Sequence, residues 1–191
     1  ARVRDHAQLI MVVPTSTTAT TMRRALTFIA TLTTAAAAQT APIPPAAEQM
    51  AAAVLPLPAE MRADATVMGY KTAGKLEVLK SGSNGMICLA LYVTRPDFHV
   101  ACYHRGLEAF MARGRELRAN GVQGTAVDSA RYKEIEDGRL KMPKVGALYS
   151  LSGKKESWDA AKGTATGAMQ LSVVYMPGAT TAETGITTTA K

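Results

Sequence analysis

The two cysteines of this chain, Cys88 and Cys102, lie within one short stretch, NGMICLALYVTRPDFHVACYHRGLEAF at residues 84–110. Each cysteine sits in a β-prone run, and residues 93–97 between the runs form a loop. If the runs pair as a hairpin, Cys88 lies directly opposite Cys102. Directly opposed Cα atoms are about 4.5–5.5 Å apart, a separation that a disulfide can bridge. The same register gives two further pairs, Ala90 with Val100 and Tyr92 with Phe98. The stretch therefore predicts a hairpin closed by a Cys88–Cys102 disulfide.

Three neighbouring residues leave other interpretations of Cys102 open. On a strand, Cys102 and His104 share a face, so His104 is a candidate base for a thiolate nucleophile. If the next helix begins near His104, then Glu108 is one turn away, and Cys102, His104 and Glu108 form a compact candidate metal site. His99 lies five residues before His104, on the opposite face of a strand, and does not join that site. Two buried free thiols are the alternative to the disulfide. A His104 that caps a helix or is hydrogen-bonded in the core is the alternative to a metal-binding histidine.

The N-terminal residues have the pattern of a secretory leader. Met22-Arg23-Arg24 precedes a mildly apolar run at 25–38 that ends in small residues, which predicts a signal peptide cleaved before Gln39. The run is shorter than the roughly 20 apolar residues of a membrane span, so no transmembrane segment is expected after cleavage. A transit peptide and a plain tail are the alternatives. Export to a periplasmic or extracellular space preserves a disulfide.

Charge does not indicate a nucleic-acid partner. Removing the leader's four arginines and Asp5 from the 22 basic and 15 acidic residues lowers the net charge from +7 to +4. Such a modest excess favours solubility and does not by itself indicate nucleic acid. The sequence also lacks a basic run interleaved with aromatic residues, as a nucleic-acid groove requires. We expect no nucleic-acid partner, and other partners are not specified.

The mature chain has the pattern of an α+β domain, an antiparallel sheet with two or three helices packed against it. β-prone runs at 65–71, 75–80 and 85–92, separated by glycine-containing loops, predict a meander that leads into the hairpin. The loop SGSNG does not indicate a phosphate site, because no helix follows it. The predicted segments are an upstream region with signal peptide at 1–38, an Ala/Pro-rich linker with a short helix at 39–60, a single domain at 61–177, and a flexible or truncated tail at 178–191.

Two longer helices follow the hairpin. Residues 105–118 carry an apolar stripe, and Asn120-Gly121 supplies a left-handed C-terminus. Gly114 lies within that stripe, which predicts close approach of the helix to the sheet. A second helix is expected at 126–137, with Thr125 as its N-cap and Asp128 three residues on. Two more strands are expected at 145–152 and 169–176.

The segments NGMICLA, FHVACYHRGLEAFMARGREL and EIEDGRLKMPKVGALYSLSG together resemble a set of exported bacterial proteins of similar size. The resemblance runs from about Arg62 to Pro177 and implies no particular activity. From the residues, the favoured hypothesis is a non-catalytic ligand- or protein-binding module stabilised by one disulfide, without a cofactor. The alternative is a small hydrolase-like or metal-dependent enzyme that uses Cys102, His104 and Glu108.

Overall fold

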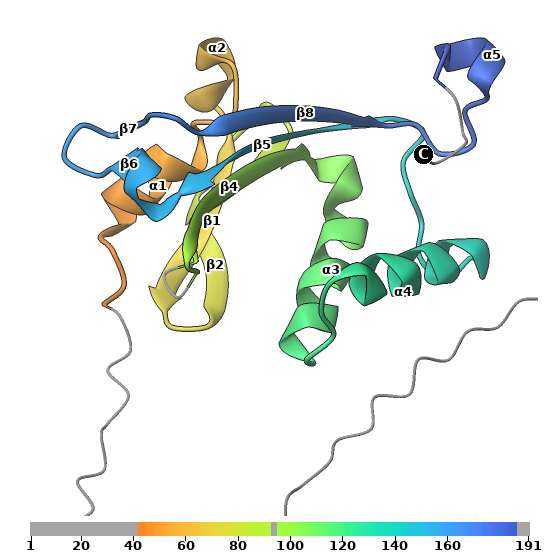
Figure 1. Cartoon of the computed structure of the whole chain (residues 1–191), viewed down its shortest axis with the longest axis horizontal. Helices are drawn as coiled ribbons and strands as arrows, with labels where there is room; N and C mark the ends of the chain where they lie inside the picture. Colours follow the sequence, from red (N-terminus) through yellow and green to blue (C-terminus); the bar gives the residue numbers. More distant parts are fainter. Residues whose placement is uncertain (1–41, 93–94, 187–191) are drawn as a thin grey trace, which may run out of the picture. The chain divides into compact units, whose positions relative to one another are not determined.

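The chain forms a six-stranded mixed sheet with helices beside it, as a computed structural model describes for residues 42–92 and 95–186 (Figure 1). The predicted leader lies outside these residues. The strand order is β2-β1-β3-β4-β5-β8, and β1 and β3 are parallel while all other neighbouring strands are antiparallel. The α+β prediction is confirmed. The strands are β1 (Thr66–Thr72), β2 (Lys75–Lys80), β3 (Met86–Leu89), β4 (Asp97–His104), β5 (Gly146–Lys154) and β8 (Met169–Tyr175), with a small separate pair, β6 (Trp158–Asp159) and β7 (Thr164–Ala165).

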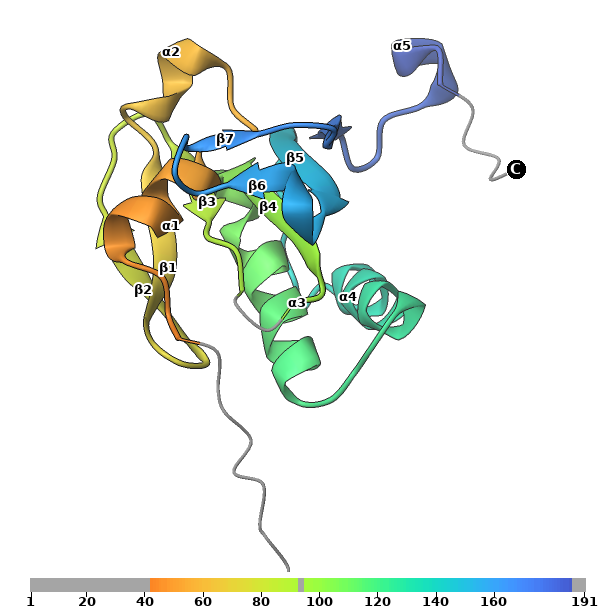
Figure 2. The same cartoon turned by 60° about the vertical axis from the view of Figure 1, so that its left-hand side comes forward.

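The helices lie on both sides of the sheet. One sheet face, which carries Cys88, Val100 and Cys102 and is called the disulfide face, packs against the first helix. The opposite face, which carries Tyr103 and is called the Tyr103 face, receives the third and fourth helices, and these lie side by side (Figure 2). The helical segments are α1 (Ala46–Ala53), α2 (Ala59–Arg62), the 3-10 turn η1 (Arg105–Leu107), α3 (Glu108–Ala119), α4 (Thr125–Glu136), the 3-10 turn η2 (Lys155–Ser157) and α5 (Thr181–Thr184).

The loop at residues 81–85 corrects the predicted meander. It crosses over the start of β1, so β3 pairs with β1 in parallel and does not pair with β2. The Gly82 N–H donates to Thr66 Oγ1 at 3.0 Å, and the Ser83 N–H donates to the Asp64 carbonyl at 2.8 Å. The prediction is wrong because a glycine-rich loop that makes these contacts has the same composition as a hairpin turn.

The predicted cysteine pair is confirmed. Cys88 lies opposite Cys102 in the β3–β4 ladder, with a Cα–Cα distance of 4.0 Å, and the two sulfurs form a disulfide. The hairpin is shorter than predicted, however, because β3 ends at Leu89. The two further pairs, Ala90 with Val100 and Tyr92 with Phe98, therefore do not form part of the ladder. The Tyr92 ring instead packs against Tyr70, with ring centroids 5.1 Å apart.

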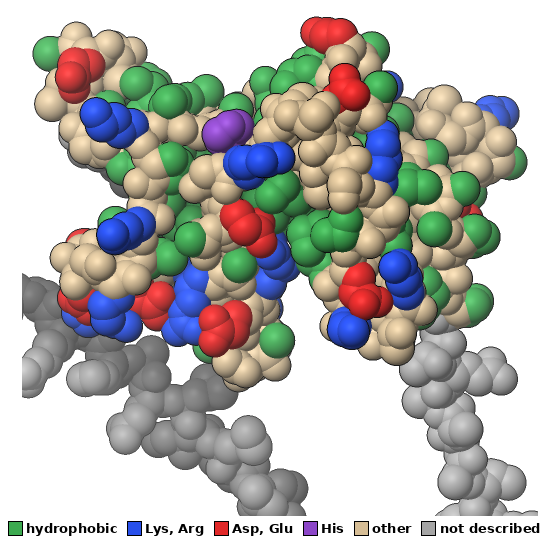
Figure 3. Space-filling view, turned by 180° about the vertical axis from the view of Figure 1, so that it is seen from behind, with side chains coloured by type: hydrophobic (Ala, Val, Ile, Leu, Met, Phe, Trp, Pro, Cys, Tyr) green, Lys and Arg blue, Asp and Glu red, His purple; other side chains and the backbone are tan. Residues whose placement is uncertain are grey.

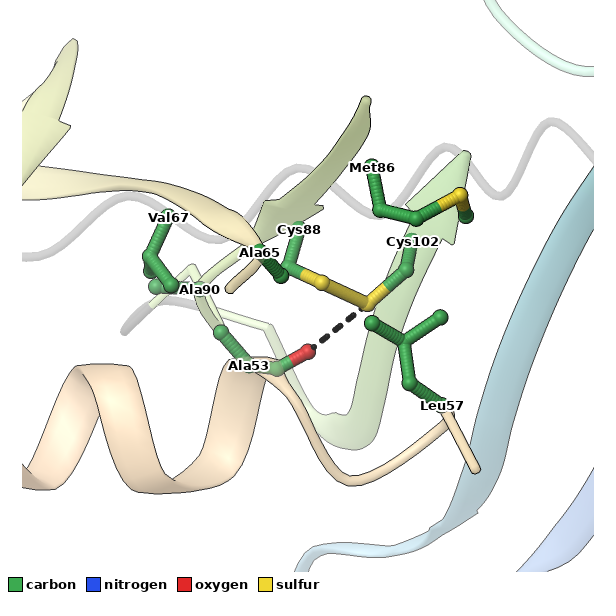
Figure 4. Packing of buried hydrophobic residues seen from close by; sticks show 8 residues of the cluster. All are labelled: Ala53, Leu57, Ala65, Val67, Met86, Cys88, Ala90 and Cys102. Carbon is green, nitrogen blue, oxygen red and sulfur yellow. Dashed lines mark hydrogen bonds between the residues drawn. A yellow bond between two sulfur atoms is a disulfide. The ribbon is translucent and has the colours of Figure 1, made fainter. Parts of the chain in front are cut away.

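The disulfide lies at the centre of a core beneath α1 (Figure 4). Both cysteines are 0% exposed, and Ala53 at the end of α1 places its carbonyl oxygen 3.2 Å from Cys102 Sγ. A disulfide sulfur has no proton to donate, so this is a sulfur–oxygen contact. The cross-link is thus surrounded by apolar side chains, namely Leu57, Ala65, Val67, Met86 and Ala90.

A buried glutamine attaches α1 to the sheet where β3 stops. The Gln49 side chain accepts a hydrogen bond from the Tyr70 N–H and donates one to the Tyr70 carbonyl, both at 2.8 Å. It donates a further bond to the Pro44 carbonyl at 2.8 Å. Because buried backbone groups need partners, Gln49 takes the place of the strand residue that β3 no longer supplies.

The helix–sheet contact differs from the prediction at Gly114. A Cβ on Gly114 would lie 2.9 Å from the Arg131 guanidinium on α4, so this glycine accommodates a neighbouring helix and not the sheet. Arg131 lies 3.8 Å from the centroid of the Phe110 ring and donates to the Phe110 carbonyl. The close approach to the sheet occurs instead at Gly146 of β5, where a Cβ would lie 2.8 Å from Leu107. The apolar periodicity identified which side of α3 is packed, but not which element packs against that side.

The ends of the helices are close to the predicted positions. Gly121 follows α3 with the expected left-handed φ of 85°. The predicted N-cap of α4 is wrong by one residue, because Gly124 takes that place with a φ of 58°, and Asp128 pairs with Arg131. The predicted tail contains α5, whose N-terminus has a complete capping box formed by Thr180 and Glu183.

Across the described ranges, no helix combines the length and the apolar character that crossing a bilayer requires.

Candidate functional site

A cleft of about 320 Å³ opens beside His104 on the disulfide face of the sheet. Its walls come from four parts of the chain: α2, the crossing loop at residues 81–85, the adjoining strands β3 and β4, and the start of β5. The cleft is lined by Met61, Asn84, Met86, His104, Val145, Gly146, Ala147 and Tyr149. Most of these residues are apolar, and no carboxylate is among them.

The geometry of η1 determines which nitrogen of His104 remains available. Nδ1 accepts a hydrogen bond from the Gly106 N–H at 3.2 Å, so His104 is the N-cap of η1. A neutral ring that accepts at Nδ1 carries its proton on Nε2. Among the described residues Nε2 has no hydrogen-bond partner, and the residue is exposed. His104 therefore has one donor to offer at the cleft.

A cation, Arg105, adjoins His104. A Cβ on Gly85 would lie 3.4 Å from His104 Nε2 and 3.9 Å from Arg105 Nε, so both groups lie close to the same point. The Arg105 N–H also donates to the Gly85 carbonyl at 2.8 Å, which connects η1 to the crossing loop. Within residues 42–92 and 95–186, Arg105 forms no ion pair. The cleft thus combines a mostly apolar wall with His104, and the Arg105 guanidinium lies close to that histidine without itself lining the cleft.

The structure separates the three residues of the predicted enzyme or metal site. Cys102 is bonded to Cys88 in the core, and His104 caps η1. Glu108 lies on the Tyr103 face, where its carboxylate accepts hydrogen bonds from the Tyr103 hydroxyl at 2.5 Å and from Arg115 at 2.6 Å. The described part of the chain holds no group of three His, Cys, Asp or Glu side chains placed to bind a metal ion.

The Tyr103, Glu108 and Arg115 side chains form a closed network. Arg115 donates to the Tyr103 hydroxyl at 2.9 Å, and Tyr103 is 1% exposed. Burial, together with the hydrogen bond to Glu108, raises the pKa of Tyr103 well above its ordinary value. The phenol therefore stays neutral, and the network joins α3 to β4 without leaving a reactive group free.

His99 is placed apart from His104, as the strand period predicts. Its Nδ1 lies 2.8 Å from Ser152 Oγ on the neighbouring strand β5, on the Tyr103 face. Burial lowers the pKa of His99, and the positive charge of Arg95 acts in the same direction. His99 is therefore a neutral, hydrogen-bonded residue between two strands and takes no part in the cleft.

The β5 wall of the cleft was not anticipated from the sequence. Val145, Ala147 and Tyr149 lie about forty residues after His104 and become its neighbours only because β5 pairs with β4. Their spacing of two places all three on one face of a strand. The segment VGALY is apolar at every position, so the sequence indicates a strand here but not which of its faces lines the cleft.

The surface is otherwise mixed in charge. On the side shown in Figure 3, Lys and Arg side chains lie among Asp and Glu side chains and apolar areas. Ion pairs among the described residues include Arg113 with Glu134 at 2.7 Å and Lys162 with Asp159 at 3.0 Å. Comparison of the chain with protein-family models, with curated proteins and with solved structures finds no match.

Proposed function

We propose that this protein is an exported, non-catalytic binding module whose cleft takes a small amphipathic anion. The observation that carries the proposal is the composition of the cleft, which is mostly apolar, includes His104 with Arg105 close to it, and has no acidic lining residue. Concave, mostly apolar sites with a few convergent polar groups are the usual form of small-molecule sites.

The apolar part of the ligand would contact the cleft wall. The volume of about 320 Å³ is at the lower end of the roughly 300–1,000 Å³ of small-molecule pockets, which suits a short acyl chain or a single aromatic ring. Two of the wall residues, Met61 and Met86, have unbranched side chains that adapt to ligands of different shape. The Asn84 side chain is already bonded to Met61 and Met86, so it adds little polarity.

The head group of the ligand would be an anion. His104 offers an N–H at Nε2, and the Arg105 guanidinium adds a positive charge and further donors. Hydrogen bonds from charged donors to carboxylates are roughly twice as strong as neutral ones. The alternative enzyme hypothesis receives less support, because Cys102 and Glu108 both have other partners.

Decanoate and decanol test the proposal, because they share an apolar chain and differ in charge. We expect decanoate to shift backbone NMR signals of cleft residues and to bind more tightly than decanol. His104→Asn retains an N-cap acceptor but removes the Nε2 donor. Loss of one charge-assisted hydrogen bond of about 1.5–3 kcal/mol corresponds to roughly ten- to hundredfold weaker binding of decanoate.

Two further variants complete this experiment. Ala147→Leu fills the cleft and should weaken both ligands, whereas Lys133→Gln removes an exposed cation of α4 and should weaken neither. Thermal unfolding of each variant checks that the fold is intact. If neither ligand shifts a cleft signal, or if His104→Asn binds decanoate as the wild type does, the anion proposal is wrong.

Export is a separate part of the proposal. It is supported by the leader pattern and by the disulfide, which persists in oxidising compartments. Expressed with its leader in a bacterium, the protein should accumulate outside the cytoplasm with a chain that begins at or near Gln39. Intact mass and N-terminal sequencing measure this, and a mature pool that retains the leader would contradict export.

A further inference from the structure

The two edges of the sheet differ in how they are protected. Unpaired strand edges attract other strands, and natural proteins commonly place charged side chains on them. The β2 edge carries Lys75, Glu77 and Lys80. The β8 edge carries none, and the sequence has no charged residue from Gly163 to Ala182. Only β5 pairs with β8 in the described part of the chain.

The side chains of β8 are also unusually open to solvent for an apolar strand. Met169 is 67% exposed, Leu171 49% and Val174 60%. In Figure 1, β8 runs along β5 at the edge of the sheet, and near its start Gln170 donates to the carbonyl of Pro56 at 2.7 Å. A seven-residue, uncharged and mostly apolar edge of this kind is expected to be paired with another strand.

We propose that two copies of this chain pair through β8, in antiparallel orientation about a two-fold axis at Ser172, and so join their sheets into one. This register is the one in which all seven residues of each β8 find a partner. It places Ser172 opposite Ser172, with three further pairs on each side: Leu171 with Val173, Gln170 with Val174, and Met169 with Tyr175.

The strand that pairs with β8 is the β8 of a second copy, because the residue pattern of β8 is complementary to itself. Strand residues at alternate positions share a face, so Met169, Leu171, Val173 and Tyr175 meet one another across the axis on the Tyr103 face. Without its leader the chain has a net charge of +4, so copies repel each other in general, and contact is least costly where no charge lies near the axis. A two-fold contact is also the commonest form of homo-oligomer.

The contact lies along the outer edge of β8 and predicts a concentration-dependent dimer. The edge of β8 is separated from His104 by β5, which lies between β8 and β4, so the inference does not depend on the proposed ligand. One strand pair buries less than the roughly 800 Å² per partner of a standard interface. We therefore expect a dimer that dissociates on dilution, measurable by sedimentation velocity over a series of protein concentrations.

Ser172→Cys tests the register directly. Opposed Cα atoms about 4.5–5.5 Å apart permit a disulfide, so two Ser172→Cys chains should cross-link through this residue under mild oxidation. Ser83→Cys places a thiol at another exposed position and should not cross-link at the same rate. The native disulfide is fully buried and should not exchange with either new thiol.

Ser172→Lys tests the contact without a cross-link. It places two positive charges opposite each other on the axis and should leave the protein monomeric at concentrations where the wild type dimerises. Ser83→Lys adds the same charge elsewhere and should leave the dimer intact, and thermal unfolding verifies that both variants fold. A wild-type protein that stays monomeric at every concentration overturns the proposal. A dimer that survives Ser172→Lys, or that Ser172→Cys does not cross-link, overturns it equally.

Discussion

Reduction of the Cys88–Cys102 disulfide is expected to lower the thermal unfolding midpoint of this protein by several degrees. The two cysteines are 14 residues apart. In the chain-entropy model, closing a loop of about 15 residues contributes roughly 3 kcal/mol by restricting the unfolded chain. For a domain of this size, about 3 kcal/mol corresponds to roughly 6–12 °C. Calorimetry of the oxidised protein and of the Cys88→Ala/Cys102→Ala double variant measures the change.

The controls separate the cross-link from the loss of two sulfur atoms in the core. The oxidised protein, denatured without reductant, should show no reactive thiol, and after reduction it should show two. Wild-type protein that is unfolded, reduced and refolded in reductant retains both sulfurs but lacks the bond, and it should also melt at the lower temperature. Equal midpoints for the oxidised and reduced wild type would mean that the bond does not stabilise the fold.

Replacing Gly82 with alanine is expected to destabilise the fold about as strongly. A Cβ on Gly82 would lie 2.2 Å from the Asp64 carbonyl oxygen and 2.5 Å from the Thr66 backbone nitrogen. Because both contacts are with backbone, side-chain rotation cannot relieve them, and the crossing loop must move away from β1. Overpacking of this kind costs about 1–3 kcal/mol or more.

Urea denaturation of Gly82→Ala measures this cost against Ser81→Ala, in which the neighbouring residue is exposed and its hydroxyl makes no hydrogen bond among the described residues. Surface substitutions away from special features usually change stability by no more than about 0.5 kcal/mol. If the two variants unfold at the same urea concentration, the crossing loop does not contact the start of β1 as described.

The predicted contact between the two cysteines, which lie close together in the chain, was correct, and predictions of contacts that depend on residues farther apart in the chain were wrong. Cys88 and Cys102 could be paired from the sequence because their strands are joined by one short loop, and few registers are available to a short hairpin. The position of β3 could not be predicted, because it depends on contacts between residues 81–85 and the chain before β1. The same holds for Gly114, whose neighbour Arg131 belongs to another helix.

The candidate site was only partly predictable for the same reason. His104 was identified as a residue of interest, and its position before a helix suggested the capping role that it has. Its neighbours in the cleft come from α2 and β5, and their proximity depends on the complete sheet order. The sequence placed Cys102, His104 and Glu108 together only because they are close along the chain, and a strand followed by a helix separates them.

The burial of the disulfide beneath α1 has a consequence for the order of events during maturation. Disulfide exchange needs direct access of a thiol or an oxidase to sulfur, and both sulfurs are inaccessible once Ala53 and Leu57 cover them. Oxidation can therefore take place only while α1 is not docked on the sheet. The bond can form as soon as β3 and β4 have paired, although α1, which covers it, comes earlier in the chain. A chain that docks α1 while still reduced would keep its thiols out of reach of any oxidant until it opens again.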